Sequence, residues 1–161
     1  MCVMANKKKH FNYEPYIKSL AEFIAKQYKV RPFPKIKISN RNQGEDEVFI
    51  KTGYYEPQER LIMLFARGRH PKDVLRSFAH EMIHHNQNLE GRLTNDSYSG
   101  QEIINDERLM KLEEEAYLKG NIVFRSWTET MQKQVESEPT EHMRKLIKLN
   151  ENQIEQIIKL T

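Results

Sequence analysis

The sequence has little of several features that mark particular classes of protein. Its 161 residues include one cysteine, Cys2, so an internal disulfide and a cysteine-ligated zinc site are both excluded. Any bound metal must therefore be held by His, Asp or Glu side chains. No apolar run approaches the length that crosses a membrane, and no internal repeat or low-complexity segment is present. We therefore expect one soluble domain without a membrane partner.

The charge of the chain has no strong bias. Lys and Arg total 26 against 23 Asp and Glu, and the formal net charge of +3 is too small to predict nucleic acid as the partner. The basic run Lys7 to Lys9 is interpreted as part of a disordered tail over residues 1–12. The residues that follow it do not form the apolar core of a signal peptide, so a cytoplasmic location is expected.

The spacing of apolar residues predicts an α+β domain over residues 13–136. An amphipathic helix is expected over 14–30, where prolines follow, and a small sheet from strands at 35–39, 48–50, 52–57 and 61–65. The last of these strands, LIMLF, is continuously apolar and is typical of a buried strand. A long helical pattern follows over 103–134. Residues 141–160 predict a C-terminal amphipathic helix that packs on the domain, within a segment 137–161.

Residues 77–87, SFAHEMIHHNQ, carry the clearest functional pattern. His80, Glu81 and His84 follow the order H-E-x-x-H. On a helix, residues four apart lie on nearly the same face, so both imidazoles can bind one cation. Neutral imidazole nitrogens suit zinc, and Glu81 can act as a general base toward water on the metal. The pattern therefore predicts a zinc site.

The residues around this motif are typical of a helix. Pro71 suits a first helical position, Asp73 places an acid in the first turn, and Gly91 follows as a stop. The imidazoles of His80 and His84 are expected on the side away from an apolar seam. The seam consists of Leu75, Phe78, Met82 and Leu89.

A catalytic zinc site usually takes three protein ligands, so a third is needed. The later helix carries three consecutive glutamates, Glu113, Glu114 and Glu115. Glu114 projects away from the apolar side of that helix and is expected in solvent. Glu113 and Glu115 flank the apolar side, and either could reach the metal.

Three further features bear on the site. Ala116 and Gly120 are small and would let the later helix approach another helix closely. His85 points about 100° away from His84 and is interpreted as a solvated residue or a partner of a ligand, not as a ligand. Tyr98, in a polar loop over 93–101, is a candidate to stabilise an oxyanion.

The H-E-x-x-H motif and the glutamates after it resemble zincin metallopeptidases of the gluzincin type, in which a Glu on a later helix completes the metal site. Glu115-Ala116, within EEEAYLKGN, resembles the Glu-Ala of thermolysin-like enzymes and the E-x-E-A of ImmA/IrrE-type peptidases. The stretches HEMIHHNQNLEGR and EAYLKGNIVFRSW are also similar to small predicted peptidases encoded by bacteriophages. The resemblance implies a minimal zincin fold with Glu115 as third ligand and Glu113 as second choice.

The sequence departs from related patterns at defined positions. SprT-like proteases share a similar metal helix but use a downstream His, and the only His after His85 is His142. The metzincin extension is missing, since Glu90 stands in that region and no third His follows. Lys119 stands four residues after Glu115, where an Asp that supports the ligands is usual.

These observations predict a zinc-dependent peptidase that acts on a protein or peptide substrate. His80, His84 and Glu115 would bind the metal, and Glu81 would be the general base.

Two alternatives come from other classes of protein. In the first, zinc joins two helices of a non-catalytic interaction module. In the second, a metal-free helical protein binds nucleic acid through Lys7 to Lys9.

Overall fold

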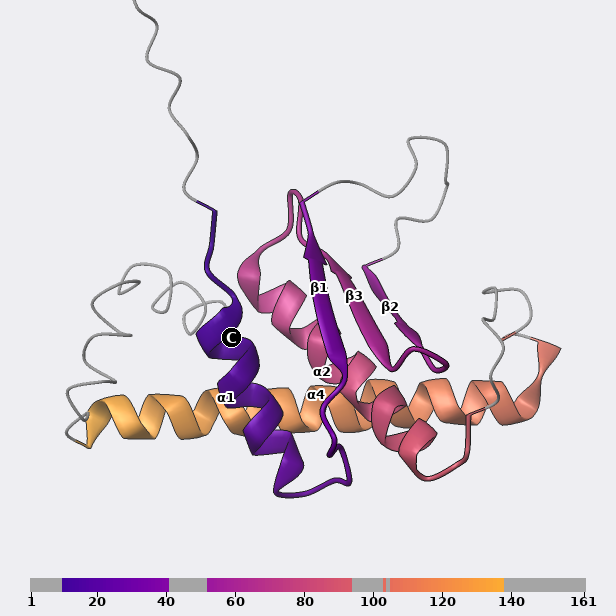
Figure 1. Cartoon of the computed structure of the whole chain (residues 1–161). Helices are drawn as coiled ribbons and strands as arrows, with labels where there is room; N and C mark the ends of the chain where they lie inside the picture. The colour runs from indigo at the N-terminus through magenta and orange to yellow at the C-terminus, as the bar shows by residue number, and fades with distance from the viewer. Residues whose placement is uncertain (1–9, 41–51, 94–102, 104, 138–161) are drawn as a thin grey trace, which may run out of the picture.

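The computed structural model of the chain describes residues 10–40, 52–93, 103 and 105–137 (Figure 1). Within them, helices and a small mixed sheet form a fold of the α+β class that the sequence predicts. The elements are α1 (Glu14–Ala25), β1 (Lys35–Ser39), β2 (Gly53–Glu56), β3 (Leu61–Phe65), α2 (Pro71–Leu89) and α4 (Glu107–Glu136). Among the described residues, none of the helices is both long and apolar enough to cross a membrane.

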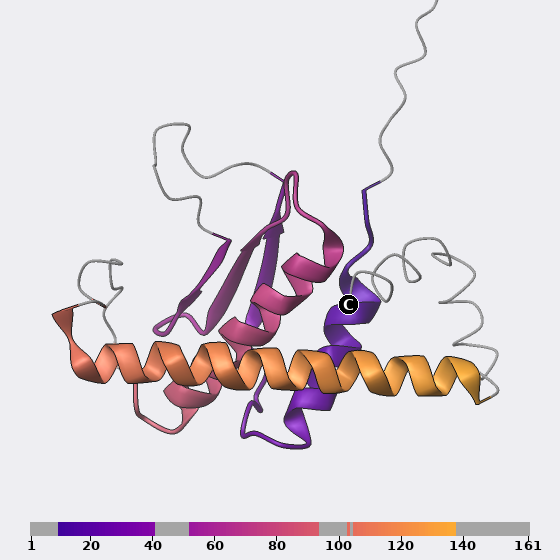
Figure 2. The same ribbon diagram turned by 180° about the vertical axis from the view of Figure 1, so that it is seen from behind.

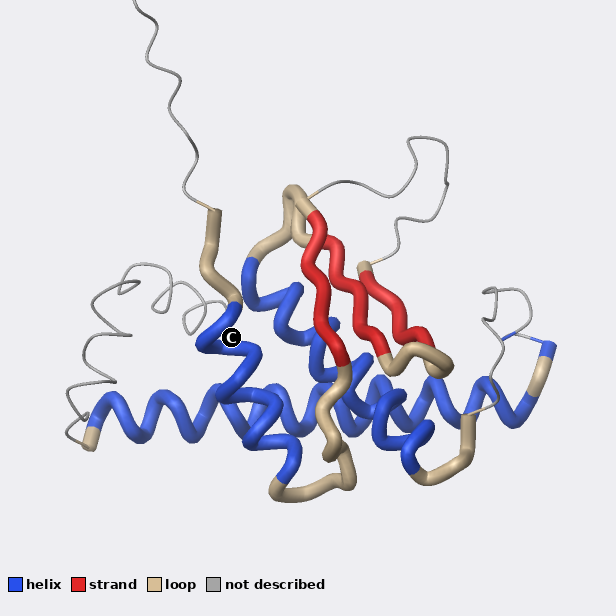
Figure 3. Tube along the Cα trace, in the orientation of Figure 1, coloured by secondary structure: helices blue, strands red, loops and turns tan. Residues whose placement is uncertain are grey.

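The three strands form one mixed sheet in the order β1-β3-β2 (Figure 3). β1 pairs parallel to β3, and β2 pairs antiparallel to it. β3 takes the central position because its apolar run is covered on the helical side, where Ile62 and Leu64 are fully buried. The expected strands at 35–39 and 61–65 are confirmed, and the one at 52–57 is shorter. The expected strand at 48–50 lies outside the described residues.

The helix expected over 14–30 ends earlier, at Ala25. Its buried stripe consists of Tyr16, Ile17, Leu20, Ala21 and Ile24. Val30 is also fully buried, but it lies in the connection to β1 and not in the helix. Apolar residues beyond Ala25 are therefore explained by the packing of that connection. Helical spacing alone does not distinguish a buried connection from a longer helix.

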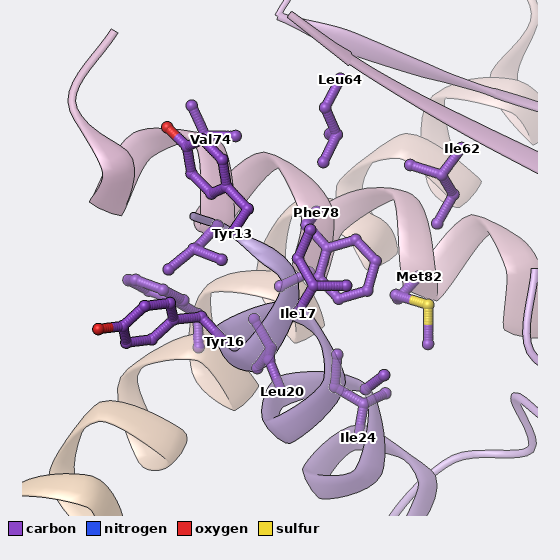
Figure 4. Close-up of a cluster of buried hydrophobic side chains, with 14 of the residues drawn as sticks. Tyr13, Tyr16, Ile17, Leu20, Ile24, Ile62, Leu64, Val74, Phe78 and Met82 are labelled. Atoms are coloured by element: carbon purple, nitrogen blue, oxygen red, sulfur yellow. The ribbon is translucent and has the colours of Figure 1, made fainter. Parts of the chain in front are cut away.

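The core lies between α1, the sheet and α2, and Val123, Phe124 and Trp127 of α4 also belong to it. Figure 4 shows Phe78 and Met82 of α2 facing Ile62 of β3 and Ile24 of α1. Phe78 and Met82 belong to the predicted apolar seam, and both are fully buried. Burial of such a side chain contributes about 1.5–3 kcal/mol. The opposite side of α2 is thus left to contact another element.

That element is α4, which crosses α2 on the side away from the sheet (Figures 1 and 2). Ala116 and Gly120 lie at the crossing and are buried. A Cβ atom placed on Gly120 would lie 3.0 Å from both the backbone N and the Cα of His80. The expectation that these small residues permit a close helix approach is therefore confirmed. The predicted helix over 141–160 and Tyr98 lie outside the described residues.

We expect Gly120→Ala to lower the free energy of unfolding, although alanine is the better helix former. Helix propensity favours alanine by about 1 kcal/mol. The new Cβ would press on backbone atoms of His80, which cannot turn aside as a flexible side chain can. Overpacking of this kind costs about 1–3 kcal/mol, so the net loss should reach up to about 2 kcal/mol. Urea unfolding of the metal-free protein measures it.

Thr130→Ala is the matched control, since Thr130 is an exposed residue of the same helix and gains propensity without a new contact. It should leave stability unchanged or slightly raised. A Gly120→Ala variant that is more stable than the wild type by the full gain in helix propensity would contradict the close approach of α2 and α4.

Candidate metal centre

Local sequence signals define the helix that carries the H-E-x-x-H motif. The His70 side chain caps α2 by accepting a hydrogen bond from the backbone N–H of Lys72, and Pro71 occupies the first helical position. Gly91 follows the helix with a φ of +72°, a conformation that glycine adopts without strain. The predicted helix and both of its predicted boundary residues are therefore confirmed.

The helix brings the three residues of the motif together. The Nε2 atoms of His80 and His84 lie 3.1 Å apart. His80, Glu81 and His84 form a group that could hold a metal ion, with one ligand atom from each within 4.8 Å of the others. Glu81 and His84 are buried, whereas His80 is partly exposed. The motif thus forms one compact cluster with one accessible side.

Glu113 of α4 completes this cluster. Its Oε2 lies 3.3 Å from Nε2 of His80, and its Oε1 lies 3.2 Å from Nε2 of His84. The second choice of the sequence analysis is therefore the glutamate that contacts both imidazoles. Two helices contribute donor atoms, and they meet where the small residues of α4 allow close packing.

Glu115, the first choice for third ligand, is not brought to the imidazoles, and Glu113 lies beside them instead. The Glu115 carboxylate accepts two hydrogen bonds from Arg92, at 2.6 and 3.0 Å, and one from Lys119. Glu115 lies about 200° around α4 from Glu113, so only one of them can face α2. The sequence contains one sign of this placement: Lys119 follows Glu115 by four residues, a helical spacing that favours an ion pair between them. Glu114 is exposed, as predicted.

The charges of the cluster favour a cation. Burial alone would lower the pKa of His84, but the carboxylates of Glu113 and Glu81 raise it to about 9. Burial opposes ionisation of Glu113, yet its contacts with His80 and His84 hold its pKa well below the usual range. Burial also raises the pKa of Glu81. A positive charge between these groups, whether of a proton or of a metal ion, offsets the negative charges of the Glu81 and Glu113 carboxylates.

His85 has a structural role, and its interpretation as a solvated residue is wrong. The ring is fully buried. Nε2 lies 2.8 Å from the Pro32 carbonyl, which only accepts, so Nε2 donates there. Nδ1 then accepts from the Tyr55 hydroxyl at 2.8 Å, and that hydroxyl accepts from the Asn88 amide. Through both ring nitrogens, His85 therefore ties α2 to β2 and to the chain before β1.

Gln87 was not among the site residues that the sequence indicated. This residue of α2 is fully buried, and its Oε1 lies 2.8 Å from Nδ1 of His84. Its amide nitrogen donates to the Leu112 carbonyl of α4 at 2.9 Å. The signal in the sequence was the three-residue spacing from His84, which places two side chains on neighbouring turns.

A cavity elsewhere in the protein is separate from this cluster. It has a volume of about 1030 Å³ and lies between α1, β1 and the connection from β3 to α2. Ile17, Ile36 and Arg69 are among the residues that line it, whereas His80 and His84 are not. The cavity therefore lies apart from His80 and His84.

Comparisons of the chain with protein-family models, with curated proteins and with solved structures find no match. The fold and the cluster define a small α+β protein with a His-Glu-His group that could bind a metal ion.

Proposed function

We propose that this protein is a zinc-dependent peptidase in which His80, His84 and Glu113 bind the metal and Glu81 is the general base. One observation carries the proposal: two imidazole nitrogens and a carboxylate from a second helix converge beside a buried glutamate. The H-E-x-x-H order, which resembles that of zincins, supports peptide bonds as the substrate class.

The donor atoms of the cluster fit zinc. Two imidazole nitrogens and one carboxylate oxygen form a ligand set that zinc uses in catalytic sites, and three protein ligands leave one position for water or substrate. The Glu113 and His80 side chains are 38% and 25% exposed, against 10% for His84. The cluster therefore opens to solvent beside Glu113 and His80, where a substrate carbonyl can approach.

Zinc bound by these residues would supply a Lewis acid that polarises a carbonyl and lowers the pKa of water. Glu81 supplies the proton transfers. Its buried carboxylate has a raised pKa and is a stronger base than an exposed one. It accepts the proton of the water that attacks the carbonyl carbon, and it delivers that proton to the amine nitrogen as the C–N bond breaks.

A structural metal is the second candidate, because the ligands come from both α2 and α4. A metal held by them would link the two helices of an interaction module without catalysis. The nucleic-acid alternative depends on Lys7 to Lys9, which lie outside the described residues.

The test combines metal analysis with a peptidase assay on protein purified without chelator. We expect one zinc ion per chain and hydrolysis of an unstructured substrate such as casein. Dipicolinate should abolish hydrolysis and added zinc should restore it, whereas dinicotinate, an isomer that does not chelate, should have no effect. Zinc without hydrolysis would favour the structural role, and a chain that binds no zinc would contradict the proposal.

A further inference from the structure

We infer that Gln87 is a positioning residue that holds His84 in the tautomer whose Nε2 is available to the metal. This inference rests on the proposed metal site. Gln87 is fully buried between α2 and α4, and its side chain contacts His84 through Oε1 and Leu112 through Nε2.

The orientation of the Gln87 amide is determined by the Leu112 carbonyl. A carbonyl oxygen only accepts hydrogen bonds, so the NH₂ group of Gln87 must face it, at 2.9 Å. The flipped amide would place two acceptors against each other in a buried position, and an unpaired buried polar group is costly. Oε1 of Gln87 therefore faces Nδ1 of His84, at 2.8 Å.

The orientation of the amide in turn determines the tautomer of His84. Oε1 carries no hydrogen, so Nδ1 of His84 must donate to it. In the neutral ring the lone pair then lies on Nε2. That atom faces Nε2 of His80 at 3.1 Å and Oε1 of Glu113 at 3.2 Å. Gln87 thus directs Nε2 of His84, the atom proposed to bind the metal, toward the other donors.

The same amide couples two of the proposed ligands. Leu112 directly precedes Glu113 on α4, and Gln87 lies one helical turn after His84 on α2. The hydrogen bond from Gln87 to Leu112 therefore holds the turn that carries Glu113 against the turn that carries His84. Loss of the amide should affect both the ring and the carboxylate.

The neighbouring His85 also has its tautomer set by the hydrogen-bond acceptor that its ring contacts. Its Nε2 donates to the Pro32 carbonyl, so its neutral ring carries the lone pair on Nδ1. The neutral rings of these adjacent histidines thus adopt opposite tautomers, and His84 is the one of the two that presents Nε2 to the cluster.

Three variants test this role. Gln87→Met has similar length but lacks the acceptor, and Gln87→Glu keeps the acceptor but lacks the amide donor. Asn86→Leu is the matched control, because Asn86 is a neighbouring buried amide that donates to Lys29 and Glu90. The readouts are the zinc dissociation constant, by competition with a chromophoric chelator, and the ring tautomer of His84. Long-range proton–nitrogen correlation spectra of metal-free protein, recorded at alkaline pH where the His84 ring is neutral, give the tautomer.

We expect Gln87→Met to weaken zinc binding about 10–100-fold and to give the ring with hydrogen on Nε2. Gln87→Glu should restore the tautomer, but its zinc binding should stay weaker than that of the wild type because the donor to the Leu112 carbonyl is lost. Asn86→Leu should change neither property. A Met variant with unchanged affinity and tautomer, a Glu variant with the tautomer of the Met variant, or an equal loss in Asn86→Leu would each overturn the inference. If the Met variant does not fold, the Glu variant decides alone. A wild type that binds no zinc would contradict the metal site itself, which is a different result.

Discussion

Glu81→Gln is expected to lower kcat/KM for peptide hydrolysis by about 10²–10⁴-fold while zinc stays bound. The amide has nearly the shape of the carboxylate but cannot accept the proton of the attacking water. Glu81 is 7% exposed and lies beside both imidazoles, so few water molecules can replace it as a base. Hydrolysis of a fluorogenic peptide, with elemental analysis of the same preparation, measures both quantities.

Glu114→Gln is the control for this substitution, since it makes the same chemical change at an exposed position of α4. It should leave hydrolysis and zinc content unchanged. Undiminished hydrolysis in Glu81→Gln would remove Glu81 from the mechanism. Loss of zinc in that variant would instead make Glu81 a ligand, and the general base would have to be another group.

Glu113→Gln is expected to weaken zinc binding by more than the roughly 10–100-fold that loss of a ligand's supporting partner costs. The Glu113 carboxylate is the group from α4 that contacts both imidazoles, and a neutral amide binds zinc poorly. Zinc content after dialysis and the dissociation constant from chelator competition are the measurements.

Glu115→Gln is the paired control, with the opposite expectation. Zinc binding should persist, but the free energy of unfolding should fall because Arg92 and Lys119 lose their partner. Those partners lower the pKa of Glu115 to about 2. Their stabilisation is therefore complete above the usual carboxyl pKa and is lost as the pH falls toward 2, where variant and wild type should converge. Zinc loss in Glu115→Gln alone would return the third ligand to Glu115.

The third ligand shows where sequence reasoning reached its limit. Helical spacing correctly left Glu113 and Glu115 as the candidates and placed Glu114 in solvent. The choice between them depends on the rotation of α4 about its own axis relative to α2. That rotation depends on the packing of Gly120 on His80, a residue of another helix. The resemblance to gluzincins selected Glu115, and the ion pairs with Arg92 and Lys119 engage that residue elsewhere.

His85 and Gln87 were misjudged or missed for a related reason. The acceptor of His85 is a carbonyl 53 residues earlier, and that of Gln87 is a carbonyl 25 residues later. The spacing of residues within α2 cannot predict partners that lie in other parts of the chain. A buried histidine and a solvated one look alike in sequence until the chain that covers them is placed.

The sequence by itself determined the α+β class, the bounds of α2 and the convergence of His80 and His84, because caps and helical periodicity act within a few residues. Only the tertiary structure decided that Glu113 faces them, that His85 joins α2 to β2 and that Gln87 contacts both His84 and Leu112. Each of these depends on side chains or carbonyls brought together from distant parts of the chain, where packing of whole helices selects the contact.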